Sequence, residues 1–247
     1  MEHKLGCIPD KYDKRDIPLG AFLDSYAIIQ ESLDYKLYFD IGDNQGQDPS
    51  CVGYGCVAIK EAIDRMNCEY TRLSEIWLYD QAKRRDEEPY CEGTSIRIAM
   101  KIMASIGCAP FSFIEEKRPY AFGKYDSLII PRELTSPFRI KTYARLRNID
   151  EMCRCLAQHG PFAIGVLVTD EFNNMVGPGI IPDSYTKYYG GHCIAVTGYS
   201  IPEQTFTIRN SWGECWGDGG FSKLSFNYVD RFMLDAWGIV DVTPNEI

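Results

Sequence analysis

Hydrophobic residues recur at intervals of three and four through the first half of the chain. The pattern runs through "SCVGYGCVAIKEAIDRM" (50–66), "LSEIWLYDQAKRR" (73–85) and "TSIRIAMKIMASIG" (94–107). This spacing gathers the apolar side chains on one face of a helix, and a Ser or Thr at the start can cap its free N–H groups. The pattern therefore predicts three helices, with Ser50 as one N-cap and Gly107 as one C-cap.

From about residue 137 the pattern changes to short runs rich in Ile, Val, Phe and Tyr, which predict strands. One helical stretch, 150–160, interrupts them. The runs are "FRIKTYARL", "PFAIGVLVT", "HCIAVTGYS", "TFTIRN", "GGFSKLS" and "AWGIVDV". Helices followed by strands indicate an α+β fold, and residues 107–137 are the expected junction. Residues 1–45 show weak periodicity, with one short helix expected near residues 20–30.

The length, composition and net charge of the chain limit the classes of protein to which it can belong. The 247 residues suffice for one large domain or two lobes, and the longest apolar run, "FAIGVLV", is far too short to span a membrane. A net charge of -9 disfavours nucleic acid as a partner. The charged opening "MEHKLGCIPDKYDKRD" lacks the apolar centre of a signal peptide, so we expect an intracellular protein, inside a virion if it is viral. Its ten cysteines are expected to be mostly thiols.

Three residues have the chemistry of a nucleophilic site. Cys51 begins a predicted helix, where the helix dipole favours the thiolate. His192 lies in an apolar strand entered by two glycines, whereas His3 lies in a terminus expected to be mobile and His159 ends a surface helix. Asn210 opens "NSWGECWGDGG", and its amide could orient an imidazole. Each has a structural alternative, such as a buried core thiol or a hydrogen-bonded core histidine.

The order and spacing of these three residues join the separate indications into one pattern. His192 follows Cys51 by 141 residues and Asn210 follows it by 159. With "NQGQDPSC", "GGHCIAVTGYS" and "IRNSWGECWGDGGF", the sequence resembles the papain-like cysteine peptidases, and in detail their compact bacterial and viral branch. The resemblance implies a two-lobed fold with the active-site cleft between a helical lobe and a β-barrel-like lobe.

The resemblance also implies roles for individual residues. Cys51 would attack the scissile carbonyl, His192 would pair with it and protonate the leaving amine, and Asn210 would orient the ring. Gln45 would supply one oxyanion-hole donor beside the Cys51 N–H. Trp212 would cover the hydrogen bond between His and Asn.

Further positions are expected to bind substrate, and some depart from the family pattern. Gly93 and Thr94 match the wall that pairs with an extended peptide, whereas Gly191 and Cys193 replace the usual residues beside the pocket for the second substrate residue. Asp235 could lie at the floor of that pocket and favour a basic side chain. Asp48 stands where the family has a cysteine bonded to the counterpart of Cys91, so a free thiol is expected at Cys91.

These observations predict one peptidase domain. Its parts are an N-terminal strap or short plug (1–47), a helical lobe (48–119), a connection (120–135) and a β-rich lobe (136–247). We expect a monomer that cleaves polypeptides and needs no metal or other cofactor, with possible self-inhibition by the N-terminal segment. The alternative is a catalytically silent relative that binds peptides in its cleft, and the choice between endopeptidase and exopeptidase is open.

Overall fold

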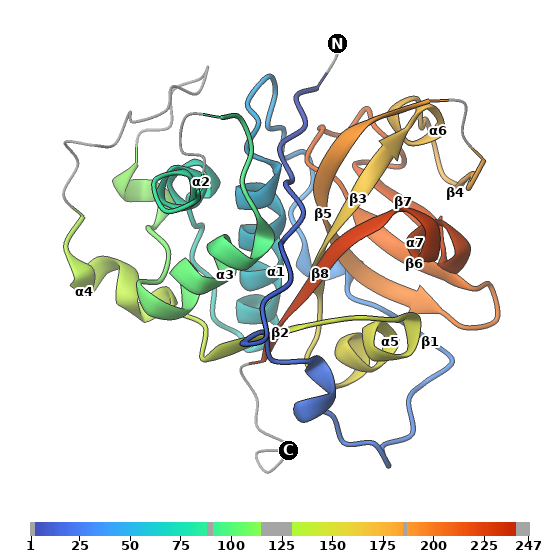
Figure 1. Ribbon diagram of the computed structural model, residues 1–247, viewed down its shortest axis with the longest axis horizontal. Coiled ribbons are helices and arrows are strands. Elements are labelled where there is room, and N and C mark those ends of the chain that lie inside the picture. The colour runs from blue at the N-terminus through green and yellow to red at the C-terminus, as the bar shows by residue number, and fades with distance from the viewer. Residues whose placement is uncertain (1–2, 88–90, 115–129, 185–186, 241–247) are drawn as a thin grey trace.

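The computed structural model describes residues 3–87, 91–114, 130–184 and 187–240, and it has two halves (Figure 1). One half is helical. Its elements are α1 (Cys51–Met66), α2 (Glu75–Lys83), α3 (Ile96–Ser105) and the short α4 (Arg132–Thr135), with 3-10 turns η3 (Phe111–Phe113) and η4 (Ser136–Phe138). The three helices expected from the hydrophobic pattern are confirmed.

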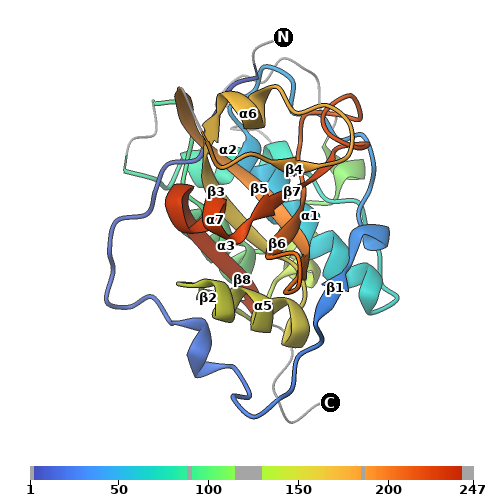
Figure 2. The same ribbon diagram turned by 90° about the vertical axis from the view of Figure 1, so that its right-hand side faces the viewer.

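The other half is built on one twisted sheet, seen from the side in Figure 2. Its strands follow the order β2-β8-β3-β5-β6-β7-β4, and β1 pairs with β5. Their bounds are β1 Ser32–Asp34, β2 Thr142–Arg145, β3 Phe162–Thr169, β4 Ile180–Ile181, β5 Tyr188–Ser200, β6 Thr205–Arg209, β7 Phe221–Ser225 and β8 Met233–Val240. Helices α5 (Ile149–Gln158), α6 (Asp170–Asn173) and α7 (Phe226–Phe232) accompany it.

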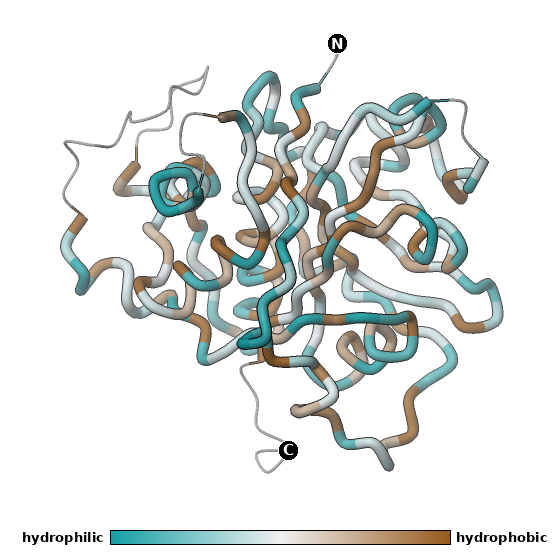
Figure 3. The backbone as a smooth tube through the Cα atoms, in the orientation of Figure 1, coloured by the Kyte–Doolittle hydropathy of each residue, from teal (hydrophilic) through white to brown (hydrophobic). Residues whose placement is uncertain are grey.

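The α+β class is confirmed, and the expected barrel-like lobe is refined. All pairings among the described strands are antiparallel except β4 with β7, and the path from β2 to β4 does not close on itself. Hydrophobic stretches follow the central elements of both halves (Figure 3). One cluster of buried apolar side chains joins the helical half to the sheet, and a second lies within the sheet half.

Helix α1 lies where the two halves meet, and its first four turns are almost entirely buried. Two glycines allow this close approach. A Cβ at Gly53 would lie 2.3 Å from the carbonyl oxygen of Glu75 in α2, and one at Gly55 would lie 2.7 Å from the sulfur of Cys193 in β5. The N-terminus of α1 is therefore fixed against both halves, which is a rigid place for a reactive side chain.

Three local expectations need correction or lie outside the described residues. The hydroxyl of Ser50 makes no capping hydrogen bond to α1, because the start of this helix is buried and Ser50 is not in an extended conformation. The helix expected near residues 20–30 is only the 3-10 turn η1 (Leu19–Ala21), and η2 (Lys36–Tyr38) follows β1. Residues 115–129, which include most of the expected connection (120–135), are not among those described.

The N-terminal segment runs between the two halves before it reaches η1 (Figures 1 and 2). Residues 3–8, called the plug below, contact both halves: the amide of Cys7 donates to the carbonyl of Gly191, and the carbonyl of Thr94 accepts from the amide of Ile8. Residues 10–16 continue along the boundary between the two halves, which is called the seam below. No described helix is long and apolar enough to cross a membrane.

Candidate active site

Cys51 is the first residue of α1 and is completely buried. Its sulfur accepts backbone hydrogen bonds from Gly6, Val52 and Cys193, which come from the plug, from α1 itself and from β5. Burial nevertheless dominates, and it raises the pKa of the Cys51 thiol to about 11. The thiolate expected from the helix dipole is therefore disfavoured while the plug is in place.

His192 and Asn210 come from neighbouring strands. Strands β5 and β6 are antiparallel, with Ala195 opposite Arg209, so His192 near one end of β5 lies beside the residue that follows β6. His192 Nε2 lies 2.7 Å from Asn210 Oδ1, which also accepts the backbone N–H of Ser211 at 2.8 Å. The predicted pair is thus hydrogen-bonded, across a sequence separation of 18.

This hydrogen bond fixes the tautomer of the imidazole. An amide oxygen can only accept, so Nε2 carries the proton and Nδ1 keeps its lone pair. In the described part of the chain, Nδ1 is buried and has no hydrogen-bond partner. Burial, opposed by the Asn210 hydrogen bond, lowers the pKa of His192 to about 4, and His3 lowers it further. Both Cys51 and His192 are consequently neutral at neutral pH in this closed state.

Aromatic rings surround the imidazole. The indole of Trp212 lies 4.7 Å from the His192 ring, centroid to centroid, and Phe172 meets both rings edge-on. The sequence predicted the place of Trp212, whereas Phe172, from α6, had no distinguishing motif. These rings exclude water from the hydrogen bond between His192 and Asn210, which strengthens it.

Gln45 is completely buried and held by Ser211. Its backbone N–H donates to the Ser211 carbonyl at 2.9 Å, and its Oε1 accepts from the Ser211 hydroxyl at 2.7 Å. Because Oε1 is engaged, Nε2 points the other way and donates to the carbonyls of Asp48 at 2.7 Å and Lys4 at 2.9 Å. The donor expected to stabilise an oxyanion is thus already bonded to a carbonyl of the plug.

The plug also occupies the predicted peptide-binding wall. The amide of Thr94 donates to the Gly6 carbonyl at 2.9 Å, the Thr94 carbonyl accepts from Ile8 at 3.0 Å, and the Gly191 carbonyl accepts from Cys7 at 3.0 Å. Glycine is needed on both sides, since a Cβ at Gly93 would lie 2.7 Å from the Gly6 oxygen and one at Gly191 would lie 2.2 Å from the Cys7 oxygen.

The side chain of Cys7 identifies a small pocket. A Cβ at Gly165 would lie 2.8 Å from the Cys7 sulfur and 3.6 Å from the side chains of Ile96 and Leu234, so these residues line it. Asp235 lies beyond, buried, and its carboxylate is already bound by Arg145 and by the Asp10 amide. Cys193 faces α1, where it contacts Cys56.

At the outer end of the plug, His3 stacks on Trp212 with ring centroids 4.8 Å apart and planes 4° apart. The expectation of a mobile His3 is therefore wrong. This contact could not be predicted from the sequence, because one histidine near a terminus has no periodicity or motif. His159 is half-buried at the end of α5 and lies 3.3 Å from the Phe22 carbonyl.

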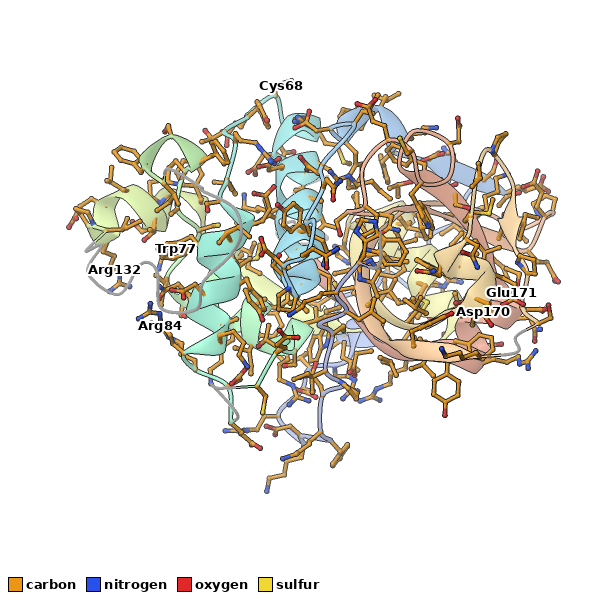
Figure 4. All side chains as sticks on the ribbon, turned by 90° about the horizontal axis from the view of Figure 1, so that it is seen from above. Cys68, Trp77, Arg84, Arg132, Asp170 and Glu171 are labelled. Carbon is orange, nitrogen blue, oxygen red and sulfur yellow. The ribbon has the colours of Figure 1, made fainter. Side chains whose placement is uncertain are left out.

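Thiols elsewhere do not compete with Cys51 for a catalytic role. All ten cysteines lie in the described ranges and none is in a disulfide. Cys68, two residues past the end of α1, is exposed and is labelled in Figure 4. Cys91 and Cys215 are exposed as well. Asp48 is buried and leaves Cys91 free, as expected from the departure at that position. No group of three His, Cys, Asp or Glu among the described residues is arranged to hold a metal ion.

The halves, the seam and the gathered Cys, His, Asn and Gln define the papain-like fold. Known structures share it: xylellain, a cysteine protease from Xylella fastidiosa, superposes with a TM-score of 0.80 at 22% identity over 96% of both chains. A procathepsin B from Trypanosoma congolense superposes with a TM-score of 0.76 at 15% identity, over 97% of this chain and 87% of its own.

Residues 32–235 match the papain family of cysteine proteases, and the chain belongs to this family. An uncharacterized peptidase C1-like protein of Acanthamoeba polyphaga mimivirus is 32% identical over 114 residues, which is 40% of this chain and 37% of the viral protein. Together with xylellain, this relative supports the resemblance to the compact bacterial and viral branch.

Proposed function

We propose that the protein is a cysteine endopeptidase held latent by its own plug. The observation that carries this proposal is that residues 3–8 occupy the predicted peptide-binding wall and the side-chain donor of Gln45. Gln45, Thr94 and Gly191 each hydrogen-bond the main chain of the plug. An extended peptide has the donors and acceptors to make the same bonds, so the seam suits polypeptide substrates.

In the proposed reaction, departure of the plug returns water to the seam and lowers the cost of charge on both catalytic groups. The Cys51 proton moves to His192 Nδ1, which has a free lone pair, and the thiolate attacks the carbonyl carbon. Gln45 Nε2 and the Cys51 N–H stabilise the oxyanion. His192 then protonates the leaving amine, an acyl-enzyme remains on Cys51, and water hydrolyses it.

The direction of the plug explains why it is not itself a good substrate. Cys7 pairs with Thr94 in parallel, and the Gly6 N–H hydrogen-bonds the sulfur of Cys51. The nucleophile therefore meets an amide hydrogen rather than a carbonyl carbon. Attack requires the carbonyl to approach the sulfur, so the bound plug is held in an unreactive orientation.

The path of the plug also supports internal cleavage. The chain passes Cys51 from His3 on the Trp212 side to Asp10 on the Asp235 side, so an extended chain lies on both sides of Cys51. An uninterrupted polypeptide can therefore lie across the site. The Cys7 pocket is small, and Asp235 is engaged by Arg145. We propose a preference for a small apolar side chain there instead of the basic one suggested by the sequence.

Gly6→Ala tests latency without altering the catalytic groups. A Cβ at Gly6 would lie 2.1 Å from the Pro49 carbonyl oxygen, so the alanine displaces the plug. Gly20→Ala is the matched control, because its Cβ would meet only Glu151, at 3.9 Å. With an internally quenched peptide blocked at both ends, Gly6→Ala should cleave at least about tenfold faster than wild type, and Gly20→Ala should match wild type.

Adding Cys51→Ala to the Gly6→Ala chain should abolish cleavage. If the Gly6→Ala chain is folded, its Cys51 does not react with an epoxide inhibitor of this family and no peptide is cleaved, the silent binding relative is the correct function. Equal cleavage by wild type and Gly6→Ala would instead refute latency and leave the peptidase activity in place.

A further inference from the structure

Beyond the plug, the N-terminal segment enters a buried group of charges, called the ion cluster below. Its members are Asp10 and Asp16 from the segment, Arg97 from α3, Arg145 from β2 and Asp235 from β8. The three carboxylates are 1–8% exposed and the two guanidiniums 20%. Here the N-terminal segment is tied to both halves of the molecule by charge rather than by backbone pairing alone.

The carboxylates of the ion cluster each accept hydrogen bonds from more than one donor. Asp16 Oδ2 accepts from Arg97 at 2.7 Å and from Arg145 at 3.2 Å. Asp235 Oδ1 is bound by Arg145, and its Oδ2 accepts the Asp10 backbone N–H at 2.5 Å. The Asp10 carboxylate accepts from the Trp237 indole at 3.0 Å and from the Arg97 amide at 3.3 Å.

Docking of the segment changes the charge balance of the ion cluster. With the segment docked, three carboxylates share two guanidiniums, an excess of one negative charge in a buried place. When the segment leaves, Asp10 and Asp16 leave with it, and Asp235 alone faces both arginines. Like charges at short range disfavour ionisation, and surplus cations favour it, so Asp235 holds a proton more readily in the docked state.

We propose that docking of residues 10–16 takes up a proton at the ion cluster, so the N-terminal segment closes the site in acid and releases it as the pH rises toward neutral. This regulation rests on the proposed latency. Burial is the main cause that raises the pKa of Asp235 to about 6 in the docked state. The charge of the Asp10 carboxylate raises it too, whereas the hydrogen bond from the Asp10 N–H and the charges of Arg145 and Arg97 oppose the shift. The docked state therefore binds more protons between about pH 4 and pH 6, and falling pH stabilises it in that window.

Other groups near the segment do not reproduce this behaviour. Burial raises the pKa of Cys7 and of Tyr143 above their ordinary values, so both stay protonated. Asp13 lines a surface pocket together with Asp16 and Asp235, but it pairs with Arg15 on the segment itself. Arg147, which lines the same surface pocket, is exposed. Opening leaves the proton count of the catalytic pair unchanged near neutral pH, since Cys51 loses the proton that His192 gains.

His3 acts in the opposite direction. Burial lowers its pKa in the docked state, so the released segment binds a proton more readily, and acid favours release through this residue alone. The contribution of Asp235 must therefore be isolated by comparing two chains that both contain His3. Asp235→Asn provides this comparison, because asparagine is isosteric and keeps an acceptor for the Asp10 amide, yet it does not titrate.

The test measures the reaction of Cys51 with 2,2′-dipyridyl disulfide in the full chain, quantified by mass spectrometry of the Cys51 peptide. Exposed Cys68 serves as an internal reference for the reagent. The ratio of wild-type to Asp235→Asn rates should be near one at about pH 4.5 and rise to about tenfold by about pH 7. Dividing the two rates cancels the titration of His3 and of the catalytic pair.

Asp16→Asn gives a second, independent variant if Asp235→Asn does not fold, since it also removes the excess carboxylate and should produce the same pH-dependent ratio. A ratio that stays constant with pH, or falls as the pH rises, would overturn the proposal. Failure of latency looks different, because Cys51 would then react equally in wild type and Gly6→Ala at every pH. Failure of the peptidase function would abolish peptide cleavage without changing these labelling rates.

Discussion

The N-terminal segment is held in two chemically different ways over a short stretch of chain. The plug is held by main-chain hydrogen bonds and the stacking of His3 on Trp212, contacts that a substrate could replace. Residues 10–16, which are strongly hydrophilic in Figure 3, are held by buried charges that a substrate does not displace. Blocking and anchoring are thus separate tasks, given to neighbouring parts of one segment.

The difference has a consequence for regulation. Backbone hydrogen bonds respond weakly to pH and salt, so the main-chain contacts of the plug alone would give nearly constant inhibition. The free energy of burying charged groups depends strongly on their protonation, because an unpaired carboxylate that is removed from water is unfavourable. Linking the two within one segment allows a proton at the ion cluster to change how often the plug leaves Cys51.

Removing residues 1–8 breaks the plug while leaving the ion cluster intact. We expect the labelling rate of Cys51 to rise about a hundredfold, which corresponds to roughly 3 kcal/mol of lost docking free energy. Hydrogen exchange of residues 10–16 should stay slow in this chain. Fast exchange there would show that the two parts dock only together, and the separation drawn above would be wrong.

Arg97→Met breaks the other part. It leaves Asp10 and Asp16 with Arg145 as the remaining guanidinium of the ion cluster, so the segment should dock less firmly, and Cys51 labelling should rise about tenfold near neutral pH. The pH dependence should become steeper, because the charge excess grows. Within the described part of the chain, the side chain of the exposed Arg85 donates hydrogen bonds only to Gln81, so Arg85→Met is a suitable control that should match wild type.

His3→Phe keeps an aromatic ring on Trp212 and removes its titration. At neutral pH the labelling rate of Cys51 should remain within about threefold of wild type, since stacked rings contribute about 1 kcal/mol. Below about pH 6 the variant should open less than wild type, because the contribution of His3 that favours release is gone. Greater opening of the variant in acid would mean that the stack depends on a histidine proton.

The sequence predicted the elements with strong periodicity and the residues within strong motifs. Cys51, His192, Asn210 and Gln45 were placed from their segments and spacing, and the structure brings His192 within 2.7 Å of Asn210. Helices α1, α2 and α3 followed from their apolar faces. Short elements such as β4, α6 and η2 were missed, because two to four residues carry too little pattern to distinguish them from loops.

The ion cluster could not be predicted from the sequence. Its members come from four separate regions, and in its own segment each resembles an ordinary surface charge. They are Asp10, Asp16, Arg97, Arg145 and Asp235. Only the tertiary fold buries them together. Asp235 shows the limit most clearly. It was expected at the floor of a substrate pocket with a preference for a basic side chain, because the sequence does not reveal that Arg145, 90 residues away, is its partner.

Ionic strength gives the smallest and most discriminating effect. Raising salt from about 0.05 M to about 1 M should increase Cys51 labelling in wild type only about twofold, because the partly buried pairs of the ion cluster are weakly screened. Gly6→Ala, whose plug is already displaced, should show no change. The exposed pairs Lys4–Glu92 and Lys11–Glu87 would be fully screened by this salt. If wild type instead opened as much in salt as Arg97→Met does in dilute buffer, those surface pairs, and not the ion cluster, would be what anchors the segment.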